Sequence, residues 1–191
     1  MWAIVGTRYG VSSIIDRKMA DINLPNRQST RLRGYDYAQA GAYFVTICTA
    51  ERRPAFGRFH AGELQLHPYG YIAAECWQRI PEHYPTVVLD EWIVMPDHFH
   101  GIIVLATESS ATTNATTPAR FSAPQSGSLS IIFNRFKGAT TRAINRARAE
   151  KNLSPVVVWQ SRFHDRIIRD EKELDATRLY IATNPARHQA S

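Results

Sequence analysis

The stretch from Trp92 to Leu105, WIVMPDHFHGIIVL, constrains the fold of this chain more than any other, because it is apolar on both sides of a single interruption. Pro96-Asp97 supplies that interruption, and such a dipeptide favours a turn between two strands. We therefore predict strands over Val87–Met95 and His98–Leu105 that pair antiparallel. Both faces of the second strand are apolar apart from two histidines, which is typical of a strand in the middle of a sheet.

Those two histidines, His98 and His100, are two residues apart in the predicted strand. Side chains at this spacing point to the same face, so the two imidazoles stand side by side and Phe99 points to the other face. Imidazole pairs of this kind bind metal ions. Two hydrogen-bonded structural histidines at the start of a strand fit the pattern as well, so the spacing alone leaves both interpretations open.

A strand and a helix are predicted ahead of this stretch. Tyr43–Thr49 is rich in β-branched and aromatic residues, which indicates a strand. Pro68 fits the first turn of a helix. Apolar residues at helical spacing predict its buried side: Tyr69, Ile72, Cys76 and Ile80. Pro81 is expected to end this helix.

The second half of the chain predicts two helices and a short strand. Ser128 is expected to cap a helix whose buried side comprises Leu129, Ile132, Phe133, Phe136, Ala143 and Ala147. Val156–Trp159 is predicted as a short strand. Asp170 and Glu173 have the spacing of a capping box and predict the start of a last helix, which Pro185 is expected to end.

The predicted order of elements is β-α-β-β-α-β followed by a helix, which indicates an α+β fold of the ferredoxin-like or RRM-like type. One antiparallel sheet then carries helices on one face, and a C-terminal helix is added. We expect a single domain over residues 31–191. Residues 1–30 are expected to form a loose arm, with Met19 as an alternative start, and residues 106–127 a flexible loop rich in Ala, Thr, Ser and Pro.

Composition narrows the class of protein. The chain has 191 residues, of which 44% are hydrophobic and 21% charged, as in globular proteins. No apolar stretch reaches the roughly 18 residues of a membrane-spanning helix, so no membrane partner is expected. Cys48 and Cys76 are too few for a disulfide framework, which favours a cytoplasmic setting. The formal net charge of +6 favours a polyanionic partner, nucleic acid first.

The last predicted helix carries a second candidate group. Tyr180 and Asn184 are four residues apart and therefore neighbours on one side of that helix. The amide oxygen of Asn184 is a suitable third ligand for a hard divalent cation. Tyr71 and Glu75 make a similar pair on the first helix, and a carboxylate is the better ligand. Residue chemistry alone therefore does not choose between the two pairs.

Three segments, in order, resemble the REP-associated tyrosine transposases, which belong to the single-tyrosine HUH transposases (HUH denotes His, a bulky apolar residue, His). Gly34–Cys48 is similar to their opening, Met95–His100 to their metal motif, and Trp159–Pro185 contains their C-terminal signature. The resemblance runs over residues 31–188. The resemblance favours Tyr180, and not Tyr71, as the functional tyrosine.

The resemblance implies metal-dependent cleavage and rejoining of single-stranded DNA, expected to form hairpins in repeated elements. It implies that Tyr180 is the nucleophile, which forms a 5′-phosphotyrosine intermediate, and that His98, His100 and Asn184 bind Mg²⁺ or Mn²⁺. No nucleotide cofactor is expected, and no Gly-rich phosphate loop is visible in the sequence. A bacterial-type, nucleoid-associated monomer or homodimer is the corresponding expectation.

Two alternatives stay open at this point. One is a domesticated nucleic-acid-binding protein on the same fold, with little or no cleavage activity. The other is a nickase like the rolling-circle initiators and relaxases, which share the chemistry of paired histidines and a tyrosine.

Binding of single-stranded DNA requires cations along the backbone and aromatic faces for the bases. The candidate contacts are Arg31, Arg33, Tyr35, Arg135, Lys137, Arg142, Arg162 and Arg166. Arg31 and Arg33 rank first because they precede the aromatic pair Tyr35 and Tyr37.

Overall fold

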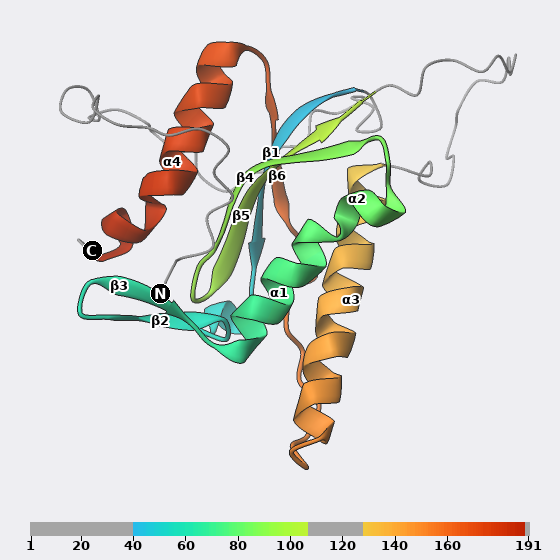
Figure 1. The fold of residues 1–191 in the computed structure, drawn as a ribbon, viewed down its shortest axis with the longest axis vertical. Helices are drawn as coiled ribbons and strands as arrows, with labels where there is room; N and C mark the ends of the chain where they lie inside the picture. Colours follow the sequence, from blue (N-terminus) through green and yellow to red (C-terminus); the bar gives the residue numbers. More distant parts are fainter. Residues whose placement is uncertain (1–39, 107–127, 190–191) are drawn as a thin grey trace, which may run out of the picture.

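The computed structural model describes residues 40–106 and 128–189, which form a four-stranded antiparallel sheet with helices on both faces (Figure 1). The strands of this sheet are β1 (Gly41–Cys48), β4 (Val87–Val94), β5 (His98–Leu105) and β6 (His164–Ile168). They lie in the order β4-β5-β1-β6, so β1 and β5 are central. This is the strand arrangement of a ferredoxin-like sheet, and the predicted fold class is confirmed.

Several predictions fall on other parts of the chain. The arm over residues 1–30, the contacts Arg31, Arg33 and Tyr35, and the loop beyond Ala106 up to residue 127 lie outside the described residues.

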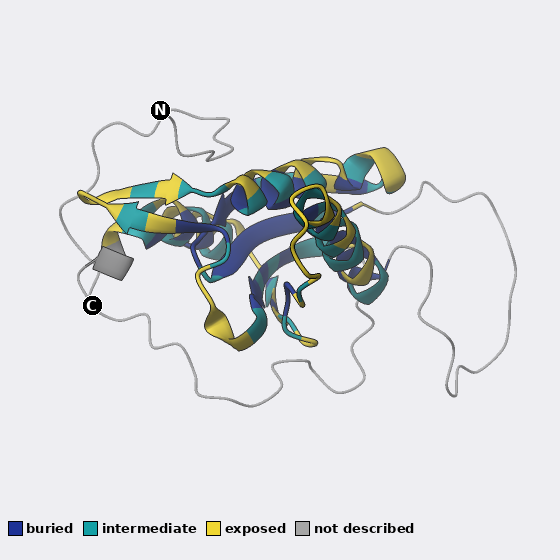
Figure 2. Cartoon of the chain, turned by 90° about the horizontal axis from the view of Figure 1, so that it is seen from below, coloured by how far each residue is buried: buried dark blue, intermediate teal, exposed yellow. Residues whose placement is uncertain are grey.

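Helices cover the sheet from opposite sides (Figures 1 and 2). On one face lie α1 (Pro68–Gln78), the short α2 (Ile80–His83) and α3 (Leu129–Ala149). On the other face lies α4 (Glu171–Gln189).

Two small elements complete the described chain. The 3-10 turn η1 (Ala50–Arg52) follows β1. A hairpin of β2 (Gly57–His60) and β3 (Glu63–Leu66) packs on the same side of the sheet as α4, through Phe59 and Leu64. This hairpin is absent from the sequence prediction, because its strands are short and carry no long apolar run.

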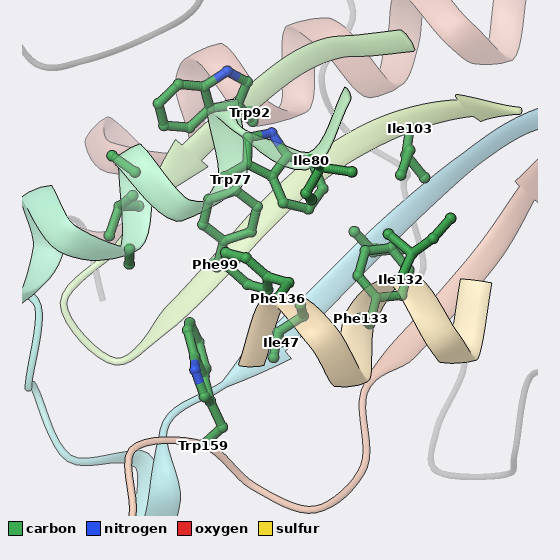
Figure 3. Close-up of a cluster of buried hydrophobic side chains, with 14 of the residues drawn as sticks. Ile47, Trp77, Ile80, Trp92, Phe99, Ile103, Ile132, Phe133, Phe136 and Trp159 are labelled. Carbon is green, nitrogen blue, oxygen red and sulfur yellow. The ribbon is translucent and has the colours of Figure 1, made fainter. Parts of the chain in front are cut away.

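The larger core lies between the sheet and the layer of α1 and α3 (Figure 3). Alternate residues of β1 are fully buried there: Tyr43, Val45 and Ile47. The rings of Trp77 and Phe99 lie 4.5 Å apart at its centre. Helix α1 comes this close to β5 because Gly101 has no side chain, since a Cβ there would lie 2.6 Å from the Trp77 ring. Glycine is thus required at position 101 by close packing.

A smaller core lies under α4. It joins Ile93, Met95 and Ile102 from the sheet side to Ile181 of α4. Because side chains alternate along a strand, Ile102 shares its face of β5 with the two histidines. The smaller core therefore holds α4 over the face of the strand that carries them.

The predicted strand at Val156–Trp159 is wrong. Within it Trp159 makes only an isolated bridge to Thr49, and Val157 is 77% exposed. The fourth strand of the sheet is β6, which begins with the polar residues His164-Asp165-Arg166. β6 pairs with β1 at the edge of the sheet. An edge strand is half solvated and needs few apolar residues, so its sequence signal is weak.

Both predicted proline boundaries are also wrong. α1 ends at Gln78, but Pro81 lies inside the following helix α2, where a proline in the first turn loses no helical hydrogen bond. Pro185 lies inside α4, which continues to Gln189. A proline there has no N–H to donate to the preceding turn, and packing of the rest of the helix outweighs that loss.

The buried sides of two helices differ in part from those predicted. In α1 the buried residues are Gly70, Ala73, Ala74 and Trp77, whereas Tyr69, Ile72 and Cys76 are partly buried. In α3, Thr140 and Ile144 are buried, whereas Ala143 and Ala147 are only partly buried. In α1, small residues allow the close approach to the sheet, a role that a search for large apolar side chains overlooks.

Candidate metal and nucleophile site

His98 and His100 lie side by side on the face of β5 that α4 covers. Each residue is 5% exposed, and their ring centres are 4.6 Å apart. The strand alternation that orients them also directs Phe99 into the larger core on the opposite face. The pair is thus held in a partly enclosed position on a central strand.

Asp97 supports the first histidine. Its Oδ1 lies 2.6 Å from Nδ1 of His98. Because a carboxylate can only accept, Nδ1 carries a proton, and in the neutral imidazole Nε2 has the lone pair that binds a ligand. The same hydrogen bond holds the pKa of Asp97 at about 2. A carboxylate behind an imidazole in this way fixes the ring and raises its basicity as a ligand.

Thr46 supports the second histidine. Its Oγ1 lies 2.8 Å from Nδ1 of His100, across the β1–β5 pairing. Burial, followed by repulsion from His98, lowers the pKa of His100 to about 3. His100 is therefore neutral at physiological pH, which is the form that binds metal. Binding through Nε2 requires that Nδ1–H donates to Thr46.

Helix α4 brings Tyr180 against this pair. The rings of Tyr180 and His100 have centres 5.4 Å apart. Phe44 of β1 stacks on His100 at 5.2 Å and meets Tyr180 edge-on at 5.9 Å. The three rings form one contact group on the α4 side of the sheet.

The rival tyrosine occupies a different place. Tyr71 is 43% exposed and Glu75 is exposed, and both belong to α1. Because α1 covers the opposite face of the sheet, this pair is separated from the two histidines by the sheet itself.

Asn184 lies one helical turn after Tyr180 and is 6% exposed. Its Oδ1 is buried without a hydrogen-bond partner among the described residues. A buried acceptor left unpaired is costly, so this oxygen is available to a cation. Two imidazole nitrogens and an amide oxygen suit a divalent transition metal, with Mn²⁺ favoured over Mg²⁺. Among the side chains that the structure describes, no three His, Cys, Asp or Glu form a metal cluster.

The start of α4 is fixed by a capping arrangement. The backbone N–H of Glu173 donates to Oδ1 of Asp170 at 2.8 Å, and that of Arg169 donates to the Glu173 carboxylate at 2.9 Å. The predicted helix start at these residues is confirmed.

A second attachment joins the middle of α4 to β4. Arg178 donates to Asp90 through Nε at 2.9 Å and through Nη2 at 2.7 Å, and this bidentate pair lowers the pKa of Asp90. Glu91, the next residue, is 8% exposed, and one of its carboxylate oxygens has no partner among the described residues. Burial, then the charge of Asp90, raises the pKa of Glu91 to about 7.

Two of the predicted DNA-contact residues, Lys137 and Arg166, form hydrogen bonds with other parts of the chain. Lys137 donates through Nζ to the carbonyls of Gln160 at 2.6 Å and Ser161 at 2.8 Å, which fixes the segment before β6. Burial lowers the pKa of this lysine.

Arg166 of β6 donates to Glu173 at 2.7 Å and to Thr177 at 3.0 Å on α4. Its guanidinium also lies 5.9 Å from the ring centre of Phe44. Arg166 therefore borders the candidate site, and about half of its side chain remains exposed.

The other candidates among the described residues are exposed. Arg162 lies in the segment before β6, whereas Arg135 and Arg142 belong to α3 on the opposite face.

Three residues of the site are not among the predicted site residues: Asp97, Thr46 and Phe44. Asp97 directly precedes the first histidine, so its support of that ring has a signal in the sequence. Thr46 and Phe44 reach the site only through the β1–β5 register, which pairs Thr46 with His100. Such a register is not readable from a single strand.

Within the part of the chain that the structure describes, none of the helices combines the length and the apolar character needed to cross a membrane.

Comparisons with known proteins find relatives that align over most of this chain. An uncharacterized protein of Haemophilus influenzae is 35% identical over 164 residues, which cover 84% of this chain and 88% of the relative. A second protein of that organism, named as a candidate REP-associated tyrosine transposase, is 26% identical over 155 residues, covering 80% of this chain and 74% of the relative. No protein-family profile matches the chain.

The fold is shared with a solved structure. The structure of a REP-associated tyrosine transposase bound to a REP hairpin matches with a TM-score of 0.54 and 22% sequence identity. The match covers 83% of this chain and 73% of that one.

Proposed function

We propose that the chain belongs to the family of the REP-associated tyrosine transposases, whose name a relative of 26% identity carries, and that it cleaves and rejoins single-stranded DNA through Tyr180. The observation that carries this proposal is the contact between Tyr180 and His100, whose ring centres are 5.4 Å apart on the α4 side of the sheet. A candidate nucleophile and a candidate ligand that are 80 residues apart in the sequence meet there.

The histidine pair and the amide are proposed to orient the scissile phosphate. His98, His100 and Asn184 would hold Mg²⁺ or Mn²⁺, which when bound supplies Lewis-acid polarisation of the phosphate oxygens. Asp97 and Thr46 would keep the Nδ1 protons of the two imidazoles in place, so that Nε2 of each ring would be the ligand atom.

Tyr180 is proposed to act as the nucleophile. Its Oη attacks the phosphorus, the bond from phosphorus to the 3′-oxygen breaks, and a 5′-phosphotyrosine and a free 3′-hydroxyl result. The phenol, whose ordinary pKa is near 10, loses its proton as the new bond forms, and the leaving 3′-oxygen gains one. Because one phosphodiester replaces another, rejoining requires no nucleotide cofactor.

The proposed substrate is single-stranded DNA that folds into a hairpin. A protein of the same fold has been solved with a REP hairpin bound, and the net charge of +6 suits a polyanion. Arg166 lies within β6 beside Phe44 and is placed to contact the DNA backbone on the α4 side, and the exposed Arg162 precedes that strand.

The proposal is tested by trapping the covalent intermediate. The full chain is incubated with end-labelled hairpin DNA from its own gene flanks, with Mn²⁺ or with EDTA, and run on a denaturing protein gel. We expect a labelled adduct with Mn²⁺ that is absent with EDTA and absent in Tyr180→Phe. Tyr71→Phe, which removes the rival hydroxyl from the opposite face, is the matched control and is expected to keep the adduct.

An adduct that persists in Tyr180→Phe would overturn the assignment of the nucleophile. Tight hairpin binding by the wild-type chain without any adduct would instead support a domesticated binding protein on this fold.

A further inference from the structure

A hollow of about 180 Å³ lies between the α1–α2 segment and α3, on the face of the sheet opposite the two histidines. Apolar side chains line part of it: Ile80, Ile132 and Phe136. These residues belong to the larger core and lie near one another in Figure 3, so this apolar part is held rigidly. Nothing in the proposed chemistry of Tyr180 uses this hollow.

Cations line another part of the hollow. Arg135 and Arg142 of α3 are seven residues apart, two helical turns, and both are exposed. Neither makes an ion pair with a described residue, whereas Arg79, which also lines the hollow, pairs with Glu82 at 3.0 Å. Two unpaired guanidinium groups beside an apolar surface suit a ligand that joins an anion to an apolar ring.

Tyr84 adds an aromatic face and a polar atom. The Arg135 guanidinium lies over the Tyr84 ring, 6.0 Å from its centre, which restrains the cation beside the hollow. The hydroxyl of Tyr84 is buried and has no hydrogen-bond partner among the described residues. A buried hydroxyl in this state is available to a polar group of a ligand.

We propose that this hollow binds one nucleotide unit of single-stranded DNA, as a second DNA site on the face of the sheet opposite Tyr180. The base packs on the apolar lining and the Tyr84 ring, and the adjoining phosphates pair with Arg135 and Arg142. The inference rests on the proposed function for the identity of the polymer. Duplex DNA does not fit so small a space, and in a single strand every phosphate adjoins a flat base that can cover the apolar lining.

The first test compares two double variants that remove the same charge from the same region. Arg135→Ala/Arg142→Ala removes two cations that line the hollow, and Arg146→Ala/Lys151→Ala removes two other exposed cations, one in the last turn of α3 and one just after this helix. Affinity for a hairpin with a single-stranded tail is measured by fluorescence anisotropy at several salt concentrations. We expect the first variant to bind on the order of tenfold more weakly, with a salt slope lower by about 1.4, from two single-strand phosphates. The second is expected to behave like the wild type.

The second test uses Cys76, which lines the same hollow, as a position-specific probe. Burial raises the pKa of its thiol, so alkylation is followed at pH 8.5 by peptide mass mapping, with the buried Cys48 as the internal reference. We expect a tailed hairpin to slow alkylation of Cys76 severalfold. A free nucleoside monophosphate is tested in a parallel arm, and protection by it alone would overturn the assignment to a DNA strand.

The two proposals fail differently. If the wild-type chain forms the adduct and both double variants bind DNA equally well, the nucleotide site is wrong and the function of Tyr180 stands. If the wild-type chain binds no DNA at all, both the proposed function and the proposed nucleotide site are wrong.

Discussion

At the scale of single residues, each histidine of the candidate site depends on one polar neighbour. Asp97 accepts from His98 at 2.6 Å, and Thr46 meets His100 at 2.8 Å. The two neighbours differ in charge, so they affect the two rings differently. The carboxylate raises the basicity of His98 as a ligand, whereas the hydroxyl orients His100 without adding charge.

Removing the Asp97 carboxylate is expected to weaken metal binding. We predict that Asp97→Asn lowers the affinity for Mn²⁺ roughly 10- to 100-fold, because loss of such an outer partner typically costs that much. Isothermal titration with Mn²⁺ measures the change. Arg52→Ala, which removes only the longer 3.5 Å contact to the same carboxylate, is the control and is expected to have a small effect. Unchanged affinity in Asp97→Asn would remove Asp97 from the site.

The low pKa of His100 predicts a pH-dependent stability. Its folded pKa of about 3 lies below the ordinary value of 6.5, so the unfolded chain binds the extra proton between these values. The contribution of His100 to stability is therefore complete above pH 6.5 and is lost as pH falls towards 3, by at most about 1.4 kcal/mol per pH unit.

Urea unfolding in EDTA from pH 7.5 to 4.5 tests this prediction. The free energy of unfolding of the wild type should fall relative to His100→Gln as pH decreases. Glu91, with its raised pKa of about 7, acts in the opposite sense, because its contribution is lost as pH rises from 4.5 through 7. Since both proteins retain Glu91, the difference between them isolates His100. Parallel pH profiles would contradict the assigned pKa shift.

At the scale of elements, α4 determines where the nucleophile lies. Its packing on the sheet rests on a small core around Ile181 and on two polar attachments, Glu173 to Arg166 of β6 and Arg178 to Asp90 of β4. The attachment of Arg178 to Asp90 lies half a turn from Tyr180. Loss of that pair would leave Tyr180 chemically intact but less well positioned.

We predict that Asp90→Asn slows adduct formation about tenfold while hairpin affinity changes less than twofold, because the substitution acts on the position of Tyr180. Hydrogen exchange should show faster exchange of α4 amides. Asp175→Asn is the matched control, because Asp175 contacts the same arginine at 3.0 Å but is 67% exposed. Equal rates for the two variants would show that the pair with Asp90 does not position the helix.

At the scale of the whole molecule, the four-stranded sheet lies between two hydrophobic cores, one on each of its faces. The face under α1 and α3 carries the larger core, and the face under α4 carries the candidate site. β1 and β5 contribute side chains to both cores, so neither core can form without the sheet that holds the other.

This sharing predicts a single cooperative unfolding transition. Trp77, Trp92 and Trp159 report the larger core by fluorescence, and far-UV circular dichroism reports all helices, including α4. The two probes should give the same urea midpoint, with no plateau between. A separate early loss of helical signal would show that α4 unfolds independently of the sheet.

The sequence predicted well wherever a pattern was local and strong. The strand at His98–Leu105 was predicted at its observed bounds, because an apolar run next to a Pro-Asp turn leaves few alternatives. Prediction from the sequence missed β6, whose first residues are polar, and the β2–β3 hairpin, whose strands are short. These segments are extended because they pair with neighbouring strands, not because of their composition. Prediction failed also at Pro185, where packing of α4 on the sheet outweighs the local preference of a proline.

By itself the sequence determined the fold class, the two histidines on one face of a central strand, and the pairing of Tyr180 with Asn184 on the last helix. These follow from the period of a strand and of a helix, which are properties of neighbouring residues. Only the tertiary structure decided that α4 covers the face with the histidines and α1 the other, and so brought Tyr180 rather than Tyr71 to His100. It also placed Thr46 and Phe44 beside that ring through the β1–β5 register. Contacts of this kind depend on the packing of distant segments, which no local pattern encodes.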